Sequence, residues 1–495
     1  MIKHFKPIAL IIALLMLISC FASCVQLEDI EDVVGGGEEG DVTEAFPESV
    51  EQKDYSSEFY LSIVPDSNSM KLFWVEKSEG DALSEAVYAR QEKLYSYLGV
   101  ELFASSAGNY QTYVEPFRNA VEKRDGSVDC LVTHVHGGVA GLVQDMYLSD
   151  LNEVAGLDLE QDYWNTEFMD DLAIDGSRYL GFSNYMPLST CVIAFNKDMM
   201  DQYHGSMEKS VYDLVEDYEW TLDEFISLAQ VVYTDKTGDG PTDDDIYGLT
   251  GDQWVRWIGF FHASNINLME QNESGKYEIS MMNAVNAQKT NDLVKKLKDF
   301  SMSDCTRLSF PIGGGDWSVK VQITTGRALM QLTTTGSLEA YLSYDVDFGV
   351  LPYPMYDTTQ KNVGYRSLQW GGYVCVPSYV ENEQMVGETL DVLAFYSDSV
   401  RITFYEKVLG KQVADAPEDA RMLEEYIWKT VCTDLAQCYS DKCSGVLYFL
   451  PYVTRTSEDG GKELASYYSS FSSNATKSMQ KFIQQVIVNK TKFGK

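Results

Sequence analysis

An acidic turn holds the residues that come closest to a metal-binding pattern. Asp235, Thr237 and Asp239 repeat the spacing of the first half of an EF-hand calcium loop. The twelfth position of such a loop would be Ile246, where a glutamate is required, so an EF-hand is excluded. Asp243 and the two aspartates after it could still supply carboxylates from another geometry. The turn is therefore either a structural calcium site, with Asp235, Thr237, Asp239 and Asp243 as ligands, or a solvated loop. The sequence indicates no other cofactor.

Two histidines at alternate positions are a second candidate. His134 and His136 follow a predicted strand, and alternate residues of a strand share one face, so both rings could reach one metal ion. The sequence offers no recognisable third ligand. A polar strand end, with His136 at the mouth of a binding cleft, is the more common outcome for such a pair. We therefore expect His136 to contact a ligand rather than a metal.

Aromatic residues in loop sequence are candidates for binding sugars. Sugar rings present C–H faces that stack on aromatic rings, while their hydroxyls need carboxylate or amide partners. Four tryptophans lie in or beside Gly-rich or polar sequence, namely Trp254, Trp257, Trp317 and Trp370. Any single tryptophan is more often packed in a core than exposed to a ligand. We therefore expect two of these four to line a cleft. Asp316 precedes Trp317 directly after three glycines. The predicted ligand-binding residues are Asp316, Trp317, Trp370, Trp254, Tyr185, Asn184 and His136.

Common catalytic motifs are missing from the sequence. It contains no G-x-S-x-G, no H-E-x-x-H and no G-x-x-x-x-G-K-[ST]. Two carboxylates could catalyse glycoside hydrolysis, but among 75 acidic residues such pairs arise by chance. We therefore expect no catalytic residues.

Composition bounds the architecture and the partners. The chain has 495 residues, 45% of them hydrophobic, which is too long for one ordinary domain and too apolar for a disordered protein. Two or more packed lobes are expected. With 75 acidic and 38 basic residues the net charge is -37, and this charge would repel nucleic acid and anionic membrane surfaces.

The N-terminus is typical of an exported protein. Residues 1–19 carry two lysines and then an apolar run that is too short to span a bilayer, which indicates a signal peptide. The sequence Leu17–Cys20 resembles the bacterial lipobox, in which the cysteine is acylated and becomes the new N-terminus. A second site ends at Cys24, but phenylalanine replaces the usual leucine there. We therefore expect lipidation at Cys20.

The segment that follows predicts a tether. Residues 20–57 include the sequence GGGEEGD and many carboxylates, without a sustained helical or strand period. Such a segment cannot bury enough apolar surface to offset the entropy of ordering. An acylated cysteine followed by a flexible acidic tether fits an extracytoplasmic body anchored to the outer face of the cell membrane through its lipid alone.

Strand and helix patterns alternate in the folded body. Predicted strands at 59–64, 100–103 and 128–133 are separated by segments with helical spacing of apolar residues. This β-α-β-α-β series favours an open parallel sheet with helices on both faces. Ligands of such sheets bind at the carboxyl ends of the strands, which here are the loops near 66–68 and 133–138.

One helix start is specified in detail by local sequence. Thr221 can cap a helix while Glu224, three residues later, completes a capping box, and Trp220 and Phe225 are placed to pack as a hydrophobic staple. Apolar residues then recur at helical spacing, so this helix should pack on a core. The acidic turn comes next in the chain.

These segments resemble a known family. WTLDEF followed by TDKTGDGPTDDDIYGL resembles the signature of family 1 extracellular solute-binding proteins, the ligand receptors of carbohydrate-type ABC importers. Four further segments occur in the order usual for the family: SDLNEV (149–154), CVIAFNKDMM (191–200), GRALM (326–330) and VDFGVLPYP (346–354). The resemblance covers roughly residue 59 to the C-terminus.

The resemblance implies a fold and a function. The fold is α/β, a two-lobe type II periplasmic binding protein in which each lobe is an open sheet flanked by helices, and the lobes close by hinge bending. We expect residues 58–190 plus about 320–370 in one lobe, and 191–319 plus about 371–495 in the other.

The expected function is that of a monomeric, lipid-anchored receptor without catalytic activity. It would bind an oligosaccharide or a sugar derivative in the cleft between the lobes and deliver it to the permease subunits of an ABC importer. The alternatives are a receptor for another solute, such as a peptide or a sugar phosphate, and a surface-anchored glycoside hydrolase.

Seven cysteines follow the signal region, and three of them lie in apolar strand-like runs, so most should be small buried hydrophobic residues. Export would also permit a disulfide among Cys432, Cys438 and Cys443, although their spacing matches no zinc pattern.

The lipobox generates the first prediction. Cys20→Ala should release the protein into the medium or leave the precursor unprocessed, because no other thiol occupies the acylation position. Lipid labelling and cell fractionation measure this, with Cys24→Ala as the matched control that should remain labelled and anchored. Unchanged labelling of Cys20→Ala would contradict the assignment.

Overall fold

The computed structural model describes residues 46–493, with gaps at 66–70, 79, 110–111, 135–137, 184–188, 205–207, 255, 310–320, 410–416, 444 and 456–459. The chain divides into two units, Met1–Phe46 and Pro47–Lys495. The signal peptide, Cys20, Cys24 and residues 20–45 of the tether lie outside the described residues, so their predicted roles stay predictions. For the last residues of the predicted tether the prediction is wrong, because Val50 is buried and Lys53 and Tyr55 bond Glu388. These side chains find partners far along the chain, which local sequence does not reveal.

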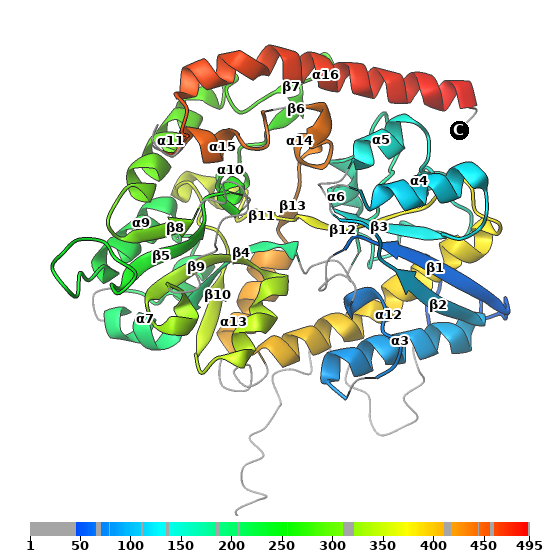
Figure 1. The fold of residues 1–495 in the computed structure, drawn as a ribbon, viewed down its shortest axis with the longest axis horizontal. Coiled ribbons are helices and arrows are strands. Elements are labelled where there is room, and N and C mark those ends of the chain that lie inside the picture. The colour runs from blue at the N-terminus through cyan, green and yellow to red at the C-terminus, as the bar shows by residue number, and fades with distance from the viewer. Residues whose placement is uncertain are drawn as a thin grey trace, which may run out of the picture. The chain divides into compact units, whose positions relative to one another are not determined.

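The first lobe is built on β1 (Ser57–Ile63), β2 (Val100–Ser105), β3 (Cys130–His134) and β12 (Gly371–Cys375). Their order in the sheet is β12-β3-β1-β2, and β1 runs parallel to both β2 and β3. Its helices are α3 (Ala82–Leu98), α4 (Val114–Lys123), α5 (Val139–Gln144), α6 (Thr166–Asp170) and α12 (Glu383–Leu409). Because α3 and α12 cover one face and α4 and α5 the other (Figure 1), the predicted parallel arrangement of these first three strands, with helices on both faces, is confirmed. The fourth strand, β12, is antiparallel to β3, so the sheet as a whole is mixed.

The second lobe is built on β4 (Cys191–Asn196), β5 (Tyr247–Asp252), β8 (Thr306–Ser309), β9 (Ala328–Thr334) and β10 (Phe348–Leu351). The order is β10-β4-β9-β5-β8. β5 is parallel to β8 and β9, whereas β4 is antiparallel to β9 and β10. Its helices are α7 (Lys197–His204), α8 (Val211–Glu216), α9 (Leu222–Val232), α10 (Gly259–Ala263) and α11 (Ala287–Ser301).

Smaller elements complete the fold. Two two-stranded sheets pair β6 (Met269–Gln271) with β7 (Tyr277–Ile279) and β11 (Ser367–Leu368) with β13 (Val431–Cys432). The later helices are α13 (Pro417–Arg421), α14 (Leu435–Cys438), α15 (Phe449–Val453) and α16 (Leu464–Phe493). The 3-10 helices are η1 (Leu151–Glu153), η3 (Arg256–Ile258), η4 (Ile323–Thr325), η5 (Thr335–Ser343), η6 (Thr358–Asn362) and η8 (Ser440–Lys442), and η7 (Met422–Trp428) is a π-helix.

Local sequence explains where several helices begin and end. The Asp81 side chain accepts backbone N–H groups at the start of α3, and Gly99 ends that helix in the left-handed conformation, with φ of 62°. Thr221 caps α9 as predicted, by accepting the N–H of Glu224. The rings of Trp220 and Phe225 pack edge to face with centroids 6.0 Å apart, which is the predicted staple.

The division of strands between the sheets differs from the sequence prediction. Residues 320–370 were expected in the first lobe, yet β9 and β10 within that range pair with β4 in the second sheet. β12, expected in the second lobe, pairs with β3 in the first. An apolar run predicts a strand but carries no information about its neighbours, because pairing depends on contacts that are distant in sequence.

Two chain crossings join the lobes side by side. Thr190, directly before β4, forms a bridge with Gln369, which lies between β11 and β12. At the crossing that leads into β12, Gly371 pairs with His134, the last residue of β3. At the crossing that leads into β4, Cys191 pairs with Thr334, the last residue of β9. The carboxyl ends of the parallel strands in both sheets therefore meet at the boundary between the lobes.

Long helices also connect the lobes. In Figure 1, α16 extends from α15 to α5, and it packs against both. Toward its end, Lys490 contacts Asp150 at 2.9 Å in the first lobe, while Gln480 donates to the carbonyl of Tyr277 in β7. No helix among the described residues has the length and apolar character to cross a membrane.

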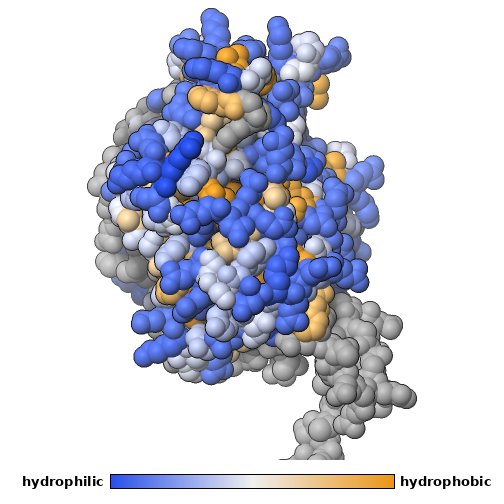
Figure 2. Space-filling model, turned by 90° about the vertical axis from the view of Figure 1, so that its right-hand side faces the viewer, coloured by the Kyte–Doolittle hydropathy of each residue, from blue (hydrophilic) through white to orange (hydrophobic). Residues whose placement is uncertain are grey.

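The cysteines and the surface agree with the composition. All seven cysteines of the described body are buried free thiols, so Cys432, Cys438 and Cys443 form no disulfide. Figure 2 shows the face on the side of the first lobe, where hydrophilic side chains predominate and apolar ones form small separate groups. That face therefore shows no large apolar patch.

A buried carboxyl in the first lobe generates the second prediction. Asp129 is 7% exposed and accepts the N–H of Tyr60, while burial raises its pKa to about 6. Because the pKa is raised on folding, protonation favours the folded state, and this stabilisation is complete below pH 4 and lost as the pH rises through about 6.

Asp129→Asn keeps the acceptor for Tyr60 but cannot ionise. We expect the variant to be more stable than the wild type at pH 8, by up to about 3 kcal/mol, and to match it near pH 4. Urea unfolding across this pH range measures the difference. An equal effect at both pH values would show that charge at this position does not matter.

Candidate ligand-binding site

A cavity of about 570 Å³ opens at the carboxyl ends of β5, β8 and β9. Its walls come from the strand ends at 250–252, 307–309 and 331–333, together with Arg256, Gln322, Ser337, Ala340, Tyr341 and Tyr344. All of these residues belong to the second lobe. Because β9 ends at the chain crossings, the cavity lies close to the boundary between the lobes. This is the place where open α/β sheets bind ligands.

An ion pair forms one wall of the cavity. The Asp252 carboxylate bonds the guanidinium of Arg256, and the two side chains are 0% and 22% exposed. The second oxygen of Asp252 accepts the N–H groups of Trp254 and Arg256, at 3.1 and 3.2 Å. The carboxylate thus fixes the backbone after β5 and holds the Arg256 guanidinium in place as a charged donor at the cavity wall.

Glycine is needed on the cavity floor. Gly251 has φ of 137°, and a Cβ built there would lie 2.9 Å from the Cβ of Leu332 in the neighbouring strand. Both the backbone conformation and the close approach of β9 therefore exclude a side chain at this position.

Two tyrosines of the 335–344 segment line the cavity in different ways. Tyr341 is 6% exposed and packs edge to face on Phe348; burial raises the pKa of its phenol, which stays a neutral donor. Tyr344 is 52% exposed at the rim, where its ring is accessible for stacking. The cavity therefore combines hydroxyl, amide and charged groups with an exposed aromatic ring.

Comparison with known proteins identifies the family. The family model for bacterial extracellular solute-binding proteins matches residues 94–406, which include most of both lobes. The chain belongs to this family. Among curated proteins, none matches the sequence.

Two solved structures share the fold. The ABC substrate-binding protein Lmo0181 from Listeria monocytogenes, in complex with cycloalternan, has a TM-score of 0.55 and 13% identity over 86% of this chain and 99% of that one. The GacH receptor of Streptomyces glaucescens, solved unliganded and with acarbose, has a TM-score of 0.52 and 14% identity over 86% of this chain and 98% of that one. At these identities the likeness shows the fold, a two-lobed α/β binding protein.

Several predicted site residues lie outside the described residues: His136, Asn184, Tyr185, Asp316 and Trp317. Their roles stay predictions. Ser309, directly before the segment 310–320, and Gln322, two residues after it, both line the cavity.

The two described tryptophans of the prediction pack against other side chains. Trp254 is half-buried and stacks on Tyr448 with centroids 3.9 Å apart, beside the cavity rather than in its lining. Trp370 is 4% exposed at the chain crossing, where it stacks on His134 and its indole N–H donates to the Cys191 sulfur. A direct contact of either ring with a ligand stays a prediction.

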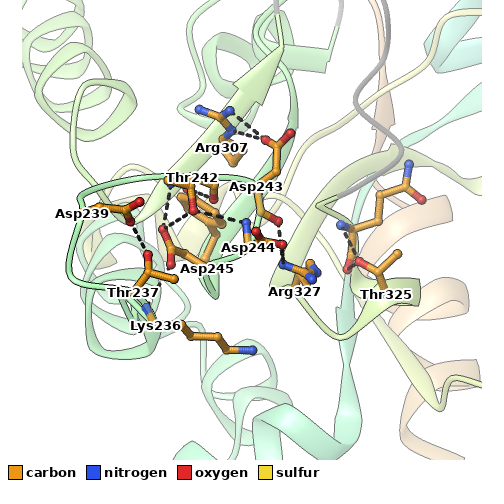
Figure 3. A network of polar contacts seen from close by, with 12 residues as sticks. Lys236, Thr237, Asp239, Thr242, Asp243, Asp244, Asp245, Arg307, Thr325 and Arg327 are labelled. Atoms are coloured by element: carbon orange, nitrogen blue, oxygen red, sulfur yellow. Dashed lines mark hydrogen bonds and ion pairs between the residues drawn. The ribbon is translucent and has the colours of Figure 1, made fainter.

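The acidic turn uses its carboxylates internally (Figure 3). Asp235 accepts the backbone N–H groups of Thr237, Gly238 and Gly240. In Figure 3, Thr237 and Asp239 bond each other, and Asp243 pairs with Arg307, at 2.7 Å. Among the described residues no three acidic, histidine or cysteine side chains are grouped to hold a metal ion. These side chains shape the turn and position Arg307. Calcium binding by Asp235, Thr237, Asp239 and Asp243 stays a prediction.

Sequence reasoning did not select the charged pair of the cavity. Asp252 and Arg256 lie four residues apart, shortly after the acidic turn, at a spacing typical of an ion pair. That signal was present in the sequence. By contrast, Gln331 and Tyr344 come from segments far along the chain, and no local pattern places them beside Asp252.

The turn generates the third prediction. Because its carboxylate oxygens already accept backbone and arginine hydrogens, removal of calcium should leave the melting temperature unchanged. Differential scanning calorimetry in excess chelator and in millimolar calcium tests this, with Asp235→Ala as the variant that should lower stability in both buffers. Destabilisation by chelator that calcium reverses would establish a calcium site instead.

Proposed function

We propose that this solute-binding protein is the receptor of an ABC importer and binds a carbohydrate, an oligosaccharide or a sugar derivative, in the cavity of the second lobe. The observation that carries the proposal is the lining at the carboxyl ends of β5, β8 and β9. It places the Asp252–Arg256 pair, two glutamines and several hydroxyls around a cavity with an aromatic rim.

The chemistry of the lining suits a saccharide. Each sugar hydroxyl donates one hydrogen bond and accepts others, so a site needs both donors and acceptors in one place. Arg256, Gln322 and Gln331 supply donors. The hydroxyl of Ser309 donates to the Gly251 carbonyl, so its oxygen is an acceptor at the cavity. Tyr344 at the rim can stack on the C–H face of a sugar ring. Two of the structural neighbours were solved with the carbohydrates cycloalternan and acarbose, which supports this choice.

Capture by lobe closure follows from the fold. The carboxyl ends of both sheets meet at the chain crossings, so a saccharide held by the second lobe would lie next to the first. The loops of the first lobe at 66–68 and 133–138, together with His136, Asn184 and Tyr185, would then complete the cleft. Closure around the sugar would mark the receptor as loaded for the permease subunits.

Catalysis is not part of the proposed function. Glycoside hydrolysis uses a pair of carboxyl groups that flank the scissile bond. Among the described residues of the cavity lining, Asp252 is the one carboxylate, and it is engaged with Arg256 and the backbone. We therefore propose a receptor without enzymatic activity.

We further propose that the receptor is monomeric and is anchored to the outer face of the cell membrane through Cys20.

The fourth prediction tests the cavity as the site. A thermal-shift screen should identify at least one saccharide that raises the melting temperature, because a ligand of the native state stabilises it. The panel is α- and β-linked gluco-, manno-, galacto- and xylo-saccharides from monosaccharide to hexasaccharide. Tyr344→Ala should then weaken the best binder about fivefold by calorimetry, since a stacking contact contributes about 1 kcal/mol.

The matched control is Tyr95→Ala, which removes a tyrosine that is 57% exposed on α3 in the first lobe. This control should bind with wild-type affinity. Equal affinities for Tyr344→Ala and the wild type would remove the cavity rim from the site. Stabilisation by a peptide or a hexose phosphate, with none by any saccharide, would favour the alternative solutes.

A further inference from the structure

A second pocket adjoins the cavity around the end of β8. Its volume is about 460 Å³, and it shares Arg307 and Leu308 with the first cavity. Two consecutive residues at the end of β5 line different spaces. Asp252 lines the first cavity, and Gln253 lines the second pocket. The remaining walls come from Pro241, from residues 301–304 at and just after the end of α11, from Thr306 and from Arg455. The two spaces are therefore neighbours along one edge of the sheet.

The wall around Arg455 is held firmly. Arg455 is 3% exposed, and its guanidinium lies over the rings of Trp254 and Tyr452, at 5.8 and 5.4 Å from their centroids. The preceding residue, Thr454, accepts hydrogen bonds from the Gln253 amide and from the Ser301 hydroxyl. A polar wall positioned in this way loses little side-chain entropy when it binds a ligand.

The pocket offers both donors and acceptors. Arg455 carries donors, the amide N–H groups of Gln253 are bonded to Thr454, and Asp304 carries an exposed carboxylate. The hydroxyls of Ser303 and Thr306 donate to backbone carbonyls at the end of α11, which leaves their oxygens as acceptors toward the pocket. This mixture matches a hydroxyl-rich group.

An anion fits the pocket less well. Asp304 would repel it, and the charge of Arg307 is already compensated by Asp243, at 2.7 Å. The net charge of the whole chain, -37, adds long-range repulsion. The lining thus favours a neutral sugar unit over a phosphate, a sulfate or a uronate.

We propose that the second pocket is a subsite for a further sugar unit of an oligosaccharide whose other end occupies the first cavity, so that the natural ligand is longer than the first cavity alone can hold. This proposal rests on the proposed function. Arg307, which lines both spaces, would contact the ligand where it passes the end of β8. The receptor would then distinguish saccharides by length as well as by sugar type.

The test compares short and long members of each saccharide series that binds the wild type. Calorimetry should show that affinity increases by about tenfold or more between the shortest binding saccharide and the hexasaccharide, as an extra occupied subsite requires. Ser303→Trp should fill the second pocket and abolish this increase, while the Kd of the shortest binder stays within about twofold. Ser274→Trp, in the exposed turn between β6 and β7, is the control for adding a tryptophan.

A milder variant protects the test from misfolding. Asp304→Ala removes one acceptor of the second pocket at an exposed position, and it should weaken the long saccharide about fivefold without changing the short one. Asp299→Ala is its matched control, because that carboxylate pairs with Lys295 on the exposed side of α11.

The other outcomes separate the two proposals. Equal affinity of the wild type for short and long saccharides would overturn the subsite. The subsite would also be overturned if both pocket variants lost the same affinity for short and long saccharides, or lost affinity for neither. Failure of every saccharide to bind the wild type would overturn the proposed function itself, and the subsite with it.

Discussion

The side chain and backbone of Gln369 are hydrogen-bonded to three segments at the boundary between the lobes, those that contain Thr190, Gly371 and residues 432–437. Its amide oxygen accepts from Thr190 at 2.6 Å and its amide nitrogen donates to Gly371 at 2.7 Å. Its backbone bonds Cys432 and the amide of Gln437. Gln369 is 0% exposed, so these polar groups have protein partners in place of water, and separating the crossings would leave them buried and unsatisfied.

This junction determines where ligands can bind. With the crossings held together, the carboxyl ends of parallel strands in both sheets lie at one boundary. Loops and strand ends at such a position present backbone and side-chain polar groups without breaking the ladder of the sheet. The two pockets of the second lobe lie along this edge, and Trp370 packs on His134 directly between the sheets. The hinge and the site therefore depend on the same short stretch of chain.

Charge is distributed unevenly between the chain and its pockets. The chain carries nearly two acidic residues for each basic one, yet three of its 11 arginines, Arg256, Arg307 and Arg455, line the two adjoining pockets. Two of them are neutralised locally, by Asp252 and Asp243. Fixed pairs of opposite charge suit the recognition of neutral hydroxyl groups, because they present strong donors and acceptors without a net field. The acidic turn contributes to this arrangement by placing Asp243 against Arg307.

The sequence by itself determined what depends on near neighbours in the chain. The capping residue Thr221, the left-handed Gly99 and the alternation of β1, α3, β2, α4 and β3 were all predictable, because caps, turns and amphipathic periods are local. Tertiary structure alone decided which strands share a sheet, since β9 and β12 each pair with strands more than 80 residues away, as in Tyr247 with Ala328 and Leu131 with Cys375. It also decided that Asp252 and Tyr344 line one cavity while Trp370 is buried in the junction. Composition and spacing select residues able to contact a sugar, but only the packing of distant segments brings them to one surface.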